Sequence, residues 1–588
     1  MNLQLKTFIL LIMSCLFLNS FAQKVQSKNS QPAIKKFKTN KVLEAKLDSI
    51  FSYYNKSTPG IAVTVLKQGK VIAKKVYGLA SLEHKVPFTH SSVVRLPYSE
   101  GREFITIAAV LMEKDGILNF NDKVRTYFPK LPDWSGSVSI HDLINHTSGF
   151  IDEWDALLLT QASMGNRVDK SQFLELLYKQ PTPEIEPGKG YMYSNSDYGL
   201  LRMIMEKASG EDLANYAWEK IFDPLGMTST RFHNDKEEVI ANRAFTYVSV
   251  GAGKYKVWMS DKISPGGNYH IVTTAEDLEL WAAAHNDKNS TISKAARRLF
   301  QNATLIPGGA KDYTFGVKLI EDEGKIVTLH QGVNNFTYLS RDGEFAIITL
   351  GNSSQEYSQY HKQIRDYLQK KSSKNFVNKV FKKNDFKYTK DELKAFTGRY
   401  IDEDTVTFES FTKASKNETK FTILNDSLIL QDENGEFHPL VYISKNVFKH
   451  PDHDAYLEFA PNPDGVKLNV HVYPQKSIYH LFKENVVLWQ PNKKVLADFT
   501  GKYYSKHLDF YWTIIQDGNG DLIVKRPTIV DTKLLPEKED EFMLRIEVYP
   551  KIKDRDASVR FHRDNKGNVT HFRVWTPRLM GHRFDKVQ

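Results

Sequence analysis

A serine and an arginine stand three residues apart at the start of an apolar run. Ser99 and Arg102 lie in the stretch RLPYSEGREF, and most residues from Phe104 to Leu111 are apolar. A helix that begins here would place both side chains on one face, because residues three apart are neighbours on a helix. A serine hydroxyl acts as a nucleophile only when an adjacent base or cation activates it. The pair therefore indicates an activated serine, with arginine in place of the more usual lysine.

The arginine limits the chemistry that this pair can perform. A buried lysine can lose its proton and act as a base, whereas arginine stays protonated. This excludes a mechanism in which a neutral amine takes the proton of Ser99. Two hypotheses remain open: a mechanism in which a fixed cation assists another proton acceptor, and a protein that has lost its catalytic activity.

Hydrophobic periodicity predicts the elements that would position the pair. Strands at both ends of the segment with helices between them predict an antiparallel sheet whose first and last strands meet, flanked by helices. The helices are expected at 41–54, 104–115, 139–146, 171–179, 197–210 and 360–371. The strands are expected as a hairpin at 60–78 and at 313–320, 325–332, 336–340 and 344–352.

The C-terminal part of the chain repeats itself. LKAFTGRY at 393–400 reappears as LADFTGKY at 496–503, an offset of 103, and Phe482 and Phe584 near the two ends differ by 102. Many short strands separated by Asp, Asn and Gly turns are typical of small antiparallel barrels. We therefore expect two β-barrel-like repeats, at 391–485 and 494–588, after a basic linker at 371–390.

The length and charge of the chain and its N-terminal segment indicate its domain number, its class of partner and its location. The 588 residues are too many for one core and predict several domains, and the net charge of +10 comes without a nucleic-acid-binding motif. Residues 1–22 combine Lys6, an apolar run at 8–18 and a small residue, Ala22, which is typical of a secretory signal peptide. Cys15, the single cysteine, fits a lipid-attachment site poorly. We expect a periplasmic or secreted protein without a transmembrane anchor after signal removal.

Four short motifs follow one another in the predicted α/β segment: Ser99-x-x-Arg102, HTSG at 146–149, YSN at 193–195 and HQG at 330–332. With flanking text such as PGKGYMYSNSDYGLLRMIMEKASG and GGNYHIVTTAEDLELW, they resemble the serine β-lactamase-like family. That family includes class C β-lactamases, D-alanyl-D-alanine carboxypeptidases, penicillin-binding proteins, D-aminopeptidases and esterases. The resemblance covers roughly residues 41–370 and implies a β-lactamase/transpeptidase-like α/β (α+β) domain. The repeats are more loosely similar to the paired barrels of D-aminopeptidase-like members.

The resemblance implies a catalytic role for five residues. Ser99 would be the acylated nucleophile, and Tyr193 would accept its proton if nearby cations stabilise the phenolate. Asn195 would hydrogen-bond the amide of the substrate or the basic residue. His330 would stand on the edge strand, where the family has lysine or histidine. Arg102 occupies the lysine position of the family's Ser-x-x-Lys pattern, and RLPYS is one residue longer than the usual spacing.

The resemblance also implies an oxyanion hole. The backbone N–H groups of Ser99 and Val333 would form it, and Gly332 would give the substrate access to the strand backbone. We interpret HTSG as structural, with Gly149 closing a helix and His146 packing or capping. No metal and no cofactor is expected.

Three functional hypotheses result. The leading one is an exported serine hydrolase that forms an acyl-enzyme on Ser99 with a D-amino-acid peptide, a β-lactam-like amide or a small ester; a peptidoglycan-derived peptide is one such partner. The alternative is a catalytically impaired pseudo-hydrolase that binds cell-envelope peptides without turnover. In the third, the C-terminal repeats bind carbohydrate or the cell envelope, and the first domain is a scaffold.

Overall fold

The computed structural model of the chain describes residues 40–96, 101–160, 169–233, 238–249, 254–257, 270–301, 313–322, 325–331, 337–342, 344–353, 358–369, 388–402, 419–424, 427–431, 437–450, 455–462, 465–472, 477–484, 489, 491–527, 529–546, 555–576 and 578–587. The predicted signal peptide with Cys15, most of the basic linker, Ser99, Gly332 and Val333 lie outside these residues. Within the described ranges, no helix has both the length and the apolar character needed to cross a membrane.

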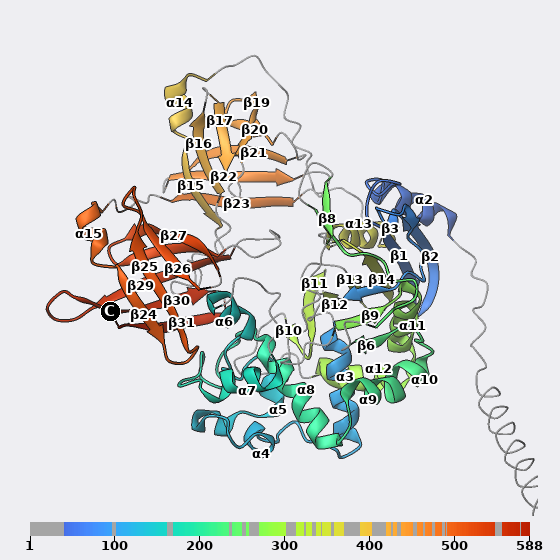
Figure 1. Ribbon diagram of the computed structural model, residues 1–588. Coiled ribbons are helices and arrows are strands. Elements are labelled where there is room, and N and C mark those ends of the chain that lie inside the picture. The colour runs from blue at the N-terminus through green and yellow to red at the C-terminus, as the bar shows by residue number, and fades with distance from the viewer. Residues whose placement is uncertain are drawn as a thin grey trace, which may run out of the picture.

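A seven-stranded antiparallel sheet forms the centre of the N-terminal part (Figure 1). Its strand order is β10-β11-β12-β13-β14-β1-β2, and Ile61 of β1 lies opposite Gly351 of β14. The prediction that the first and last strands meet is therefore confirmed. The strands are β1 (Ile61–Lys67), β2 (Lys70–Tyr77), β10 (Tyr313–Thr314), β11 (Val317–Asp322), β12 (Lys325–Gln331), β13 (Thr337–Arg341) and β14 (Phe345–Gly351).

Helices cover both faces of this sheet. Alternate side chains of β1 point to opposite faces, so Val63 and Val65 pack with α2 (Lys41–Ile50) and α13 (Ser358–Leu368). Ala62 and Leu66 belong instead to the core on the other face. That core is shared by α3 (Arg102–Lys114), α8 (Asn195–Ser209) and α11 (Ala275–Asn286).

Local capping signals in the sequence set several helix ends. Ser139 and Asp142 form a capping box at the start of α5 (Ile140–Ile144). Gly210 ends α8 in the left-handed conformation at φ +75°. The other helices of this part are α4 (Val124–Tyr127), η2 (Asp133–Ser137), α6 (Glu153–Thr160), α7 (Lys170–Tyr178), α9 (Leu213–Ala217), η3 (Trp218–Phe222), α10 (Asp223–Leu225) and α12 (Thr291–Gln301).

Among the described residues of the N-terminal part there are three further small sheets. β9 lies between β5 and β6, and the other two sheets are the pairs β3 with β4 and β7 with β8. Their bounds are β3 (Leu79–Ser81), β4 (Val86–Pro87), β5 (Val94–Leu96), β6 (Arg231–His233), β7 (Tyr247–Ser249), β8 (Tyr255–Val257) and β9 (His270–Thr273). β5 is the last described element before the start of α3.

The duplicated sequence corresponds to two similar β-rich units, each preceded by a short helix. In both units a buried tyrosine donates to a backbone carbonyl four residues earlier: Tyr400 to Phe396 at 3.2 Å and Tyr503 to Phe499 at 2.9 Å. The two pairs are again 103 residues apart. The helices are α14 (Lys390–Lys394) and α15 (Lys493–Ala497).

The second unit is a closed eight-stranded barrel, so the barrel prediction is confirmed for this repeat. Its strands are β24 (Gly501–Ser505), β25 (Phe510–Gln516), β26 (Leu522–Arg526), β27 (Ile529–Lys538), β28 (Glu541–Ile546), β29 (Arg555–Arg563), β30 (Val569–Thr576) and β31 (Leu579–Lys586).

The first unit is also barrel-like, as predicted, but its ring of strands is interrupted at one position. Among the described residues it is a nine-stranded sheet that starts at β18 and ends at β19 instead of closing. The position of the continuous β27 is taken by these two short strands. They are separated only by Leu440, whose N–H still donates to the carbonyl of Leu428 at 2.9 Å. The strands are β15 (Gly398–Asp402), β16 (Thr419–Leu424), β17 (Ser427–Gln431), β18 (Phe437–Pro439), β19 (Val441–Ser444), β20 (Val447–Lys449), β21 (Ala455–Asn462), β22 (Gly465–Val472) and β23 (Ser477–Glu484).

The closed barrel lies against the N-terminal part beside α6 (Figure 1). Trp512 Nε1 and Arg526 Nη1 donate to the carbonyls of Leu159 and Leu158, at 2.9 and 3.4 Å. These carbonyls belong to the last turn of α6 and have no partner within the helix. The barrel interior and the helices of the N-terminal part form one continuous hydrophobic cluster.

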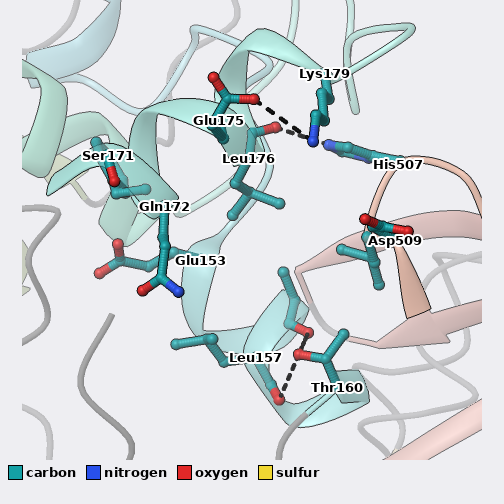
Figure 2. Close-up of a pocket in the computed structure, with 13 residues that line it drawn as sticks. Glu153, Leu157, Thr160, Ser171, Gln172, Glu175, Leu176, Lys179, His507 and Asp509 are labelled. Atoms are coloured by element: carbon teal, nitrogen blue, oxygen red, sulfur yellow. Dashed lines mark hydrogen bonds and ion pairs between the residues drawn. The ribbon is translucent and has the colours of Figure 1, made fainter. Parts of the chain in front are cut away.

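A cavity of about 440 Å³ remains at this contact, between α6, α7 and the loop from β24 to β25 (Figure 2). His507 lies at its rim, with Nε2 2.8 Å from the carbonyl of Leu176, and Lys179 is paired with Glu175 at 3.5 Å. Arg102, Tyr193 and Asn195 do not line it. The cavity is therefore separate from the predicted catalytic residues.

Candidate active site

Arg102 is the first residue of α3 and is 3% exposed. Its Nη2 donates to Asn195 Oδ1 at 2.8 Å, and its guanidinium carbon lies 4.3 Å from the ring centroid of Tyr193 and 4.9 Å from that of Tyr198. Burial alone would lower the pKa of Arg102, but the electrostatic effect of Tyr193, Tyr313 and Tyr198 outweighs burial and raises it. Arg102 is therefore a fixed buried cation.

Three surrounding elements hold the start of α3 in place. Glu103 Oε1 accepts from Arg341 Nη2 of β13 at 2.5 Å and lies 3.1 Å from His285 Nε2 of α11. Gly316, at φ +86°, follows β10 so closely that a Cβ atom would meet the backbone of Arg102 at 3.0 Å. A glycine is needed there both for the left-handed conformation and for the close approach.

Tyr193 and Asn195 precede and open α8. Asp152 Oδ2 accepts from the backbone N–H of Asn195 at 2.7 Å and from its Nδ2 at 2.8 Å. This contact orients the amide, because Oδ1 is then the atom that faces Arg102. Burial raises the pKa of Asp152, Arg578 opposes the rise, and Asp155 adds to it. Asp152 was not among the predicted site residues, and its only signal in the sequence is its place three residues after the HTSG motif.

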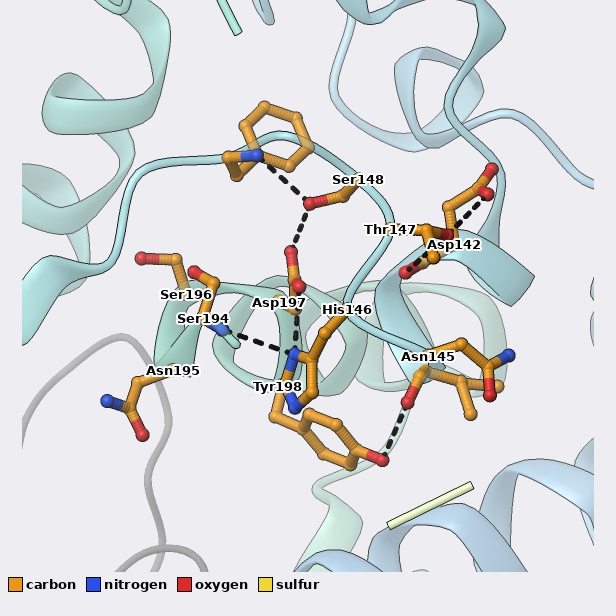
Figure 3. A network of polar contacts seen from close by, with 12 residues as sticks. Asp142, Asn145, His146, Thr147, Ser148, Ser194, Asn195, Ser196, Asp197 and Tyr198 are labelled. Carbon is orange, nitrogen blue, oxygen red and sulfur yellow. Dashed lines mark hydrogen bonds and ion pairs between the residues drawn. The ribbon is translucent and has the colours of Figure 1, made fainter. Parts of the chain in front are cut away.

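A network of buried polar side chains surrounds His146, whose ring contacts Tyr193; Figure 3 shows the bonds of this network among His146, Ser194 and Asp197. His146 has φ +57°, is fully buried, and its ring centroid is 4.8 Å from that of Tyr193. Its Nδ1 accepts from the N–H of Ser194 at 3.3 Å and lies 3.0 Å from Asp197 Oδ2. Burial lowers the pKa of His146 well below its usual value and raises that of Asp197 well above it. Burial therefore favours the uncharged form of both side chains, and the contacts of His146 with Ser194 and Asp197 favour the structural interpretation of HTSG.

The structure brings together Arg102, Tyr193 and Asn195. His330 lies on β12, with its backbone paired to Leu339 of β13. The expectation that this is an edge strand is wrong, because β11 pairs on the other side of β12 as far as Leu329 and β10 forms the edge of the sheet. Of the remaining predicted site residues, Ser99, Gly332 and Val333 are outside the described part of the chain.

Arg578 reaches this site from the closed barrel and was also missed by the sequence analysis. It lies in the turn between β30 and β31, with its guanidinium carbon 4.3 Å from the Tyr193 ring centroid. Its Nη1 is 3.7 Å from Asp152 Oδ2. The one sequence signal is a difference between the repeats, since PQKSIYHLF in the first copy has Gln475 where PRLMGHRF in the second has Arg578.

The acidic residues of this site are held by polar donors. Asp155 accepts from Thr576 at 2.5 Å, and Glu184 accepts from the N–H of Met580 at 2.6 Å. In the part of the chain that the structure describes, no three His, Cys, Asp or Glu side chains are arranged to hold a metal ion.

Glu184 should make the docked barrel sensitive to pH. Burial, together with Asp155, raises the pKa of Glu184 from 4.5 to about 7, although the hydrogen bond from Met580 opposes the rise. Below pH 4.5 the carboxyl is protonated in the folded and the unfolded chain. Between pH 4.5 and 7 only the folded chain keeps the proton, so raising the pH should lower the free energy of unfolding, by up to about 3 kcal/mol.

Urea unfolding at pH 4.5 and pH 8 measures this effect in wild type and Glu184→Gln. A glutamine can still accept from Met580 but does not titrate, so the variant should lose less stability than wild type on going to pH 8. An identical pH dependence in the two proteins would contradict the assignment.

Comparisons with known proteins identify the family of this chain. A family model described as Beta-lactamase matches residues 41–369. Penicillin-binding protein 4* of Bacillus subtilis (strain 168) is 31% identical over 287 residues, which cover 46% of this chain and 62% of that protein. A D-aminopeptidase of Brucella anthropi is 28% identical over 282 residues, covering 47% of this chain and 52% of that protein. The chain thus spans less than two thirds of the length of either relative.

Among solved structures, the octameric penicillin-binding protein homologue from Pyrococcus abyssi has a TM-score of 0.50 and 19% identity. The alignment covers 75% of this chain and 99% of that one, which shows a shared fold. The family model matches more than half of the chain, and the motifs that suggested the resemblance lie within the matched segment. The chain therefore belongs to the beta-lactamase family.

Proposed function

We propose that this protein is an exported serine hydrolase that forms an acyl-enzyme on Ser99 with an amide or ester substrate. The observation that carries the proposal is the environment of the Tyr193 hydroxyl. Its hydroxyl oxygen is buried and makes no hydrogen bond of normal geometry to the described residues, yet it lies close enough to Arg102 to raise the pKa of that guanidinium. An oxygen without such a hydrogen bond beside a fixed cation is suited to accept a proton.

In the proposed mechanism, Tyr193 acts as a phenolate. It takes the proton of the Ser99 hydroxyl as Oγ attacks the substrate carbonyl carbon, and it later gives the proton to the departing amine or alcohol. Water then hydrolyses the acyl-enzyme by the same route. Arg102 cannot act as the base. It contributes positive charge over the Tyr193 ring and holds Asn195, whose amide is oriented by Asp152.

The substrate class follows from the relatives and from the sequence. The names of the two relatives refer to penicillin and to a D-aminopeptidase, so we propose D-amino-acid peptides, amides and β-lactam-like compounds as the first substrates to test. Export is proposed from residues 1–22, which have the composition of a signal peptide.

Intact-mass spectrometry after incubation with a fluorophosphonate, and separately with a penicillin, tests acylation. We expect an adduct on wild type and none on Ser99→Ala. We also expect an adduct on Arg102→Lys, because an ammonium group keeps the positive charge next to Tyr193.

Two outcomes would contradict the proposal. An adduct on Arg102→Lys but not on wild type would mean that the arginine silences an otherwise intact site. No adduct on any of the three proteins would favour the alternative of a pseudo-hydrolase that binds peptides without turnover.

A further inference from the structure

The turn that carries Arg578 is fixed on both sides. Thr576 Oγ1 donates to Asp155 Oδ2 at 2.5 Å, and the N–H of Met580 donates to Glu184 Oε2 at 2.6 Å. Both acceptors belong to the N-terminal part, so the two bonds hold the barrel turn against it. Arg578 lies between these two anchors, and its position over the Tyr193 ring is therefore set by the docking of the barrel.

Most N–H donors of the Arg578 guanidinium make no hydrogen bond to the described residues. Within the described residues its side chain makes no hydrogen bond, and its ion pair with Asp152 spans 3.7 Å. The same Asp152 oxygen already accepts two shorter bonds from Asn195. The side chain of Arg578 is 19% exposed. A guanidinium has five N–H donors in a planar fork that matches a carboxylate, and most of these donors remain available here.

The charges around Tyr193 favour an anion. Arg102 and Arg578 each place a guanidinium carbon 4.3 Å from its ring centroid. Burial lowers the pKa of His146, and both arginines lower it further, so the imidazole adds no charge. Asp152 is the carboxylate closest to Arg578, and burial makes its ionised form less favourable. Two fixed cations in a partly buried site attract a negative group more strongly than they would in water.

We propose that Arg578 is a substrate-binding residue that receives a carboxylate of the substrate at the hydrolytic site. The substrate class is then narrower than amides and esters in general: peptides or amides that carry a free carboxylate close to the scissile bond. This inference rests on the proposed function and deepens it, since it assigns to the barrel a direct part in substrate selection.

Calorimetric titration in a Ser99→Ala background tests the proposal without turnover. The probes are D-alanyl-D-alanine and its C-terminal amide, which differ only in the carboxylate. We expect Ser99→Ala to bind the acid about 10- to 100-fold more tightly than the amide, the range of a charge-assisted hydrogen-bonded contact. Adding Arg578→Gln should remove this preference. It should lower the affinity for the dipeptide with the free carboxylate and leave the affinity for the amide nearly unchanged. Arg578→Lys should keep part of the preference, because it retains the charge but not the fork.

The proposal is overturned if Ser99→Ala binds both dipeptides equally, if it binds neither, or if the preference persists in Ser99→Ala/Arg578→Gln. If Arg578→Gln lowers the affinity for both dipeptides equally, Arg578 has a structural role in docking the barrel. This result would also overturn the proposal. Failure of the proposed function is separate, because that is read from the adduct on Ser99. A carboxylate preference without an adduct would support Arg578 as a binding residue and count against hydrolysis.

Discussion

Tyr193→Phe is expected to lower the rate of Ser99 acylation by about 10²- to 10⁴-fold, the usual contribution of a general base, with little change in stability. The substitution keeps the aromatic ring beside the guanidinium groups of Arg102 and Arg578. It removes only a hydroxyl that makes no hydrogen bond of normal geometry to the described residues. Deleting such a group costs little, since no partner is left unsatisfied.

Tyr198→Phe is the matched control. Tyr198 also lies beside Arg102, with 4.9 Å between the guanidinium carbon and the ring centroid, but its hydroxyl donates to the carbonyl of Ile144 at 3.0 Å. Its replacement leaves that carbonyl without this donor, so we expect a loss of about 1–3 kcal/mol in the free energy of unfolding and a small change in rate.

Time-resolved mass spectrometry of the adduct and urea unfolding of the two variants separate these effects. A rate for Tyr193→Phe equal to that of wild type would exclude the tyrosine as the proton acceptor. The same conclusion would follow if Tyr193→Phe and Tyr198→Phe lowered the rate equally.

Local patterns were sufficient to predict the central sheet and the helices around it. The alternation in β1 separates Val63 and Val65 from Ala62 and Leu66, and the structure places the two sets on opposite faces of the sheet. The caps at Ser139 and Gly210 depend on bonds within a few residues, so the sequence alone determines them. Arg102 was predicted from its spacing to Ser99 at a helix start, and Tyr193 and Asn195 were predicted from the resemblance of the YSN motif to the family.

Features that depend on contacts between distant segments were missed or misjudged. Asp152 and Arg578 acquire their place only when α6, α8 and the closed barrel come together, and no local pattern marks either residue. The pairing of β11 outside β12 placed His330 on an interior strand, because sheet order is set by tertiary pairing rather than by periodicity. The interruption of the first repeat between β18 and β19 is not revealed by the sequence similarity at the two ends of the unit.

Trp512→Ala is expected to cost about 3–5 kcal/mol in the free energy of unfolding, as for other large core aromatics. Trp512 is fully buried in β25 and packs against Phe572 and Phe584 at centroid distances of 5.4 and 4.9 Å. Its Nε1 also donates to the carbonyl of Leu159 in the last turn of α6. The substitution therefore removes a core side chain and one of the bonds that dock the barrel.

Urea unfolding of Trp512→Phe and Tyr511→Ala separates the two contributions. Trp512→Phe keeps most of the ring and loses the bond to Leu159, so a loss of about 1–2 kcal/mol is expected. Tyr511 is the adjacent residue of β25 but is 41% exposed, and its replacement should cost less than about 1 kcal/mol. A loss for Trp512→Ala no larger than that for Tyr511→Ala would contradict a continuous core between the barrel and the N-terminal part. If the core is continuous, Trp512→Ala should also weaken the carboxylate preference assigned to Arg578, because the turn that carries Arg578 depends on the same docking.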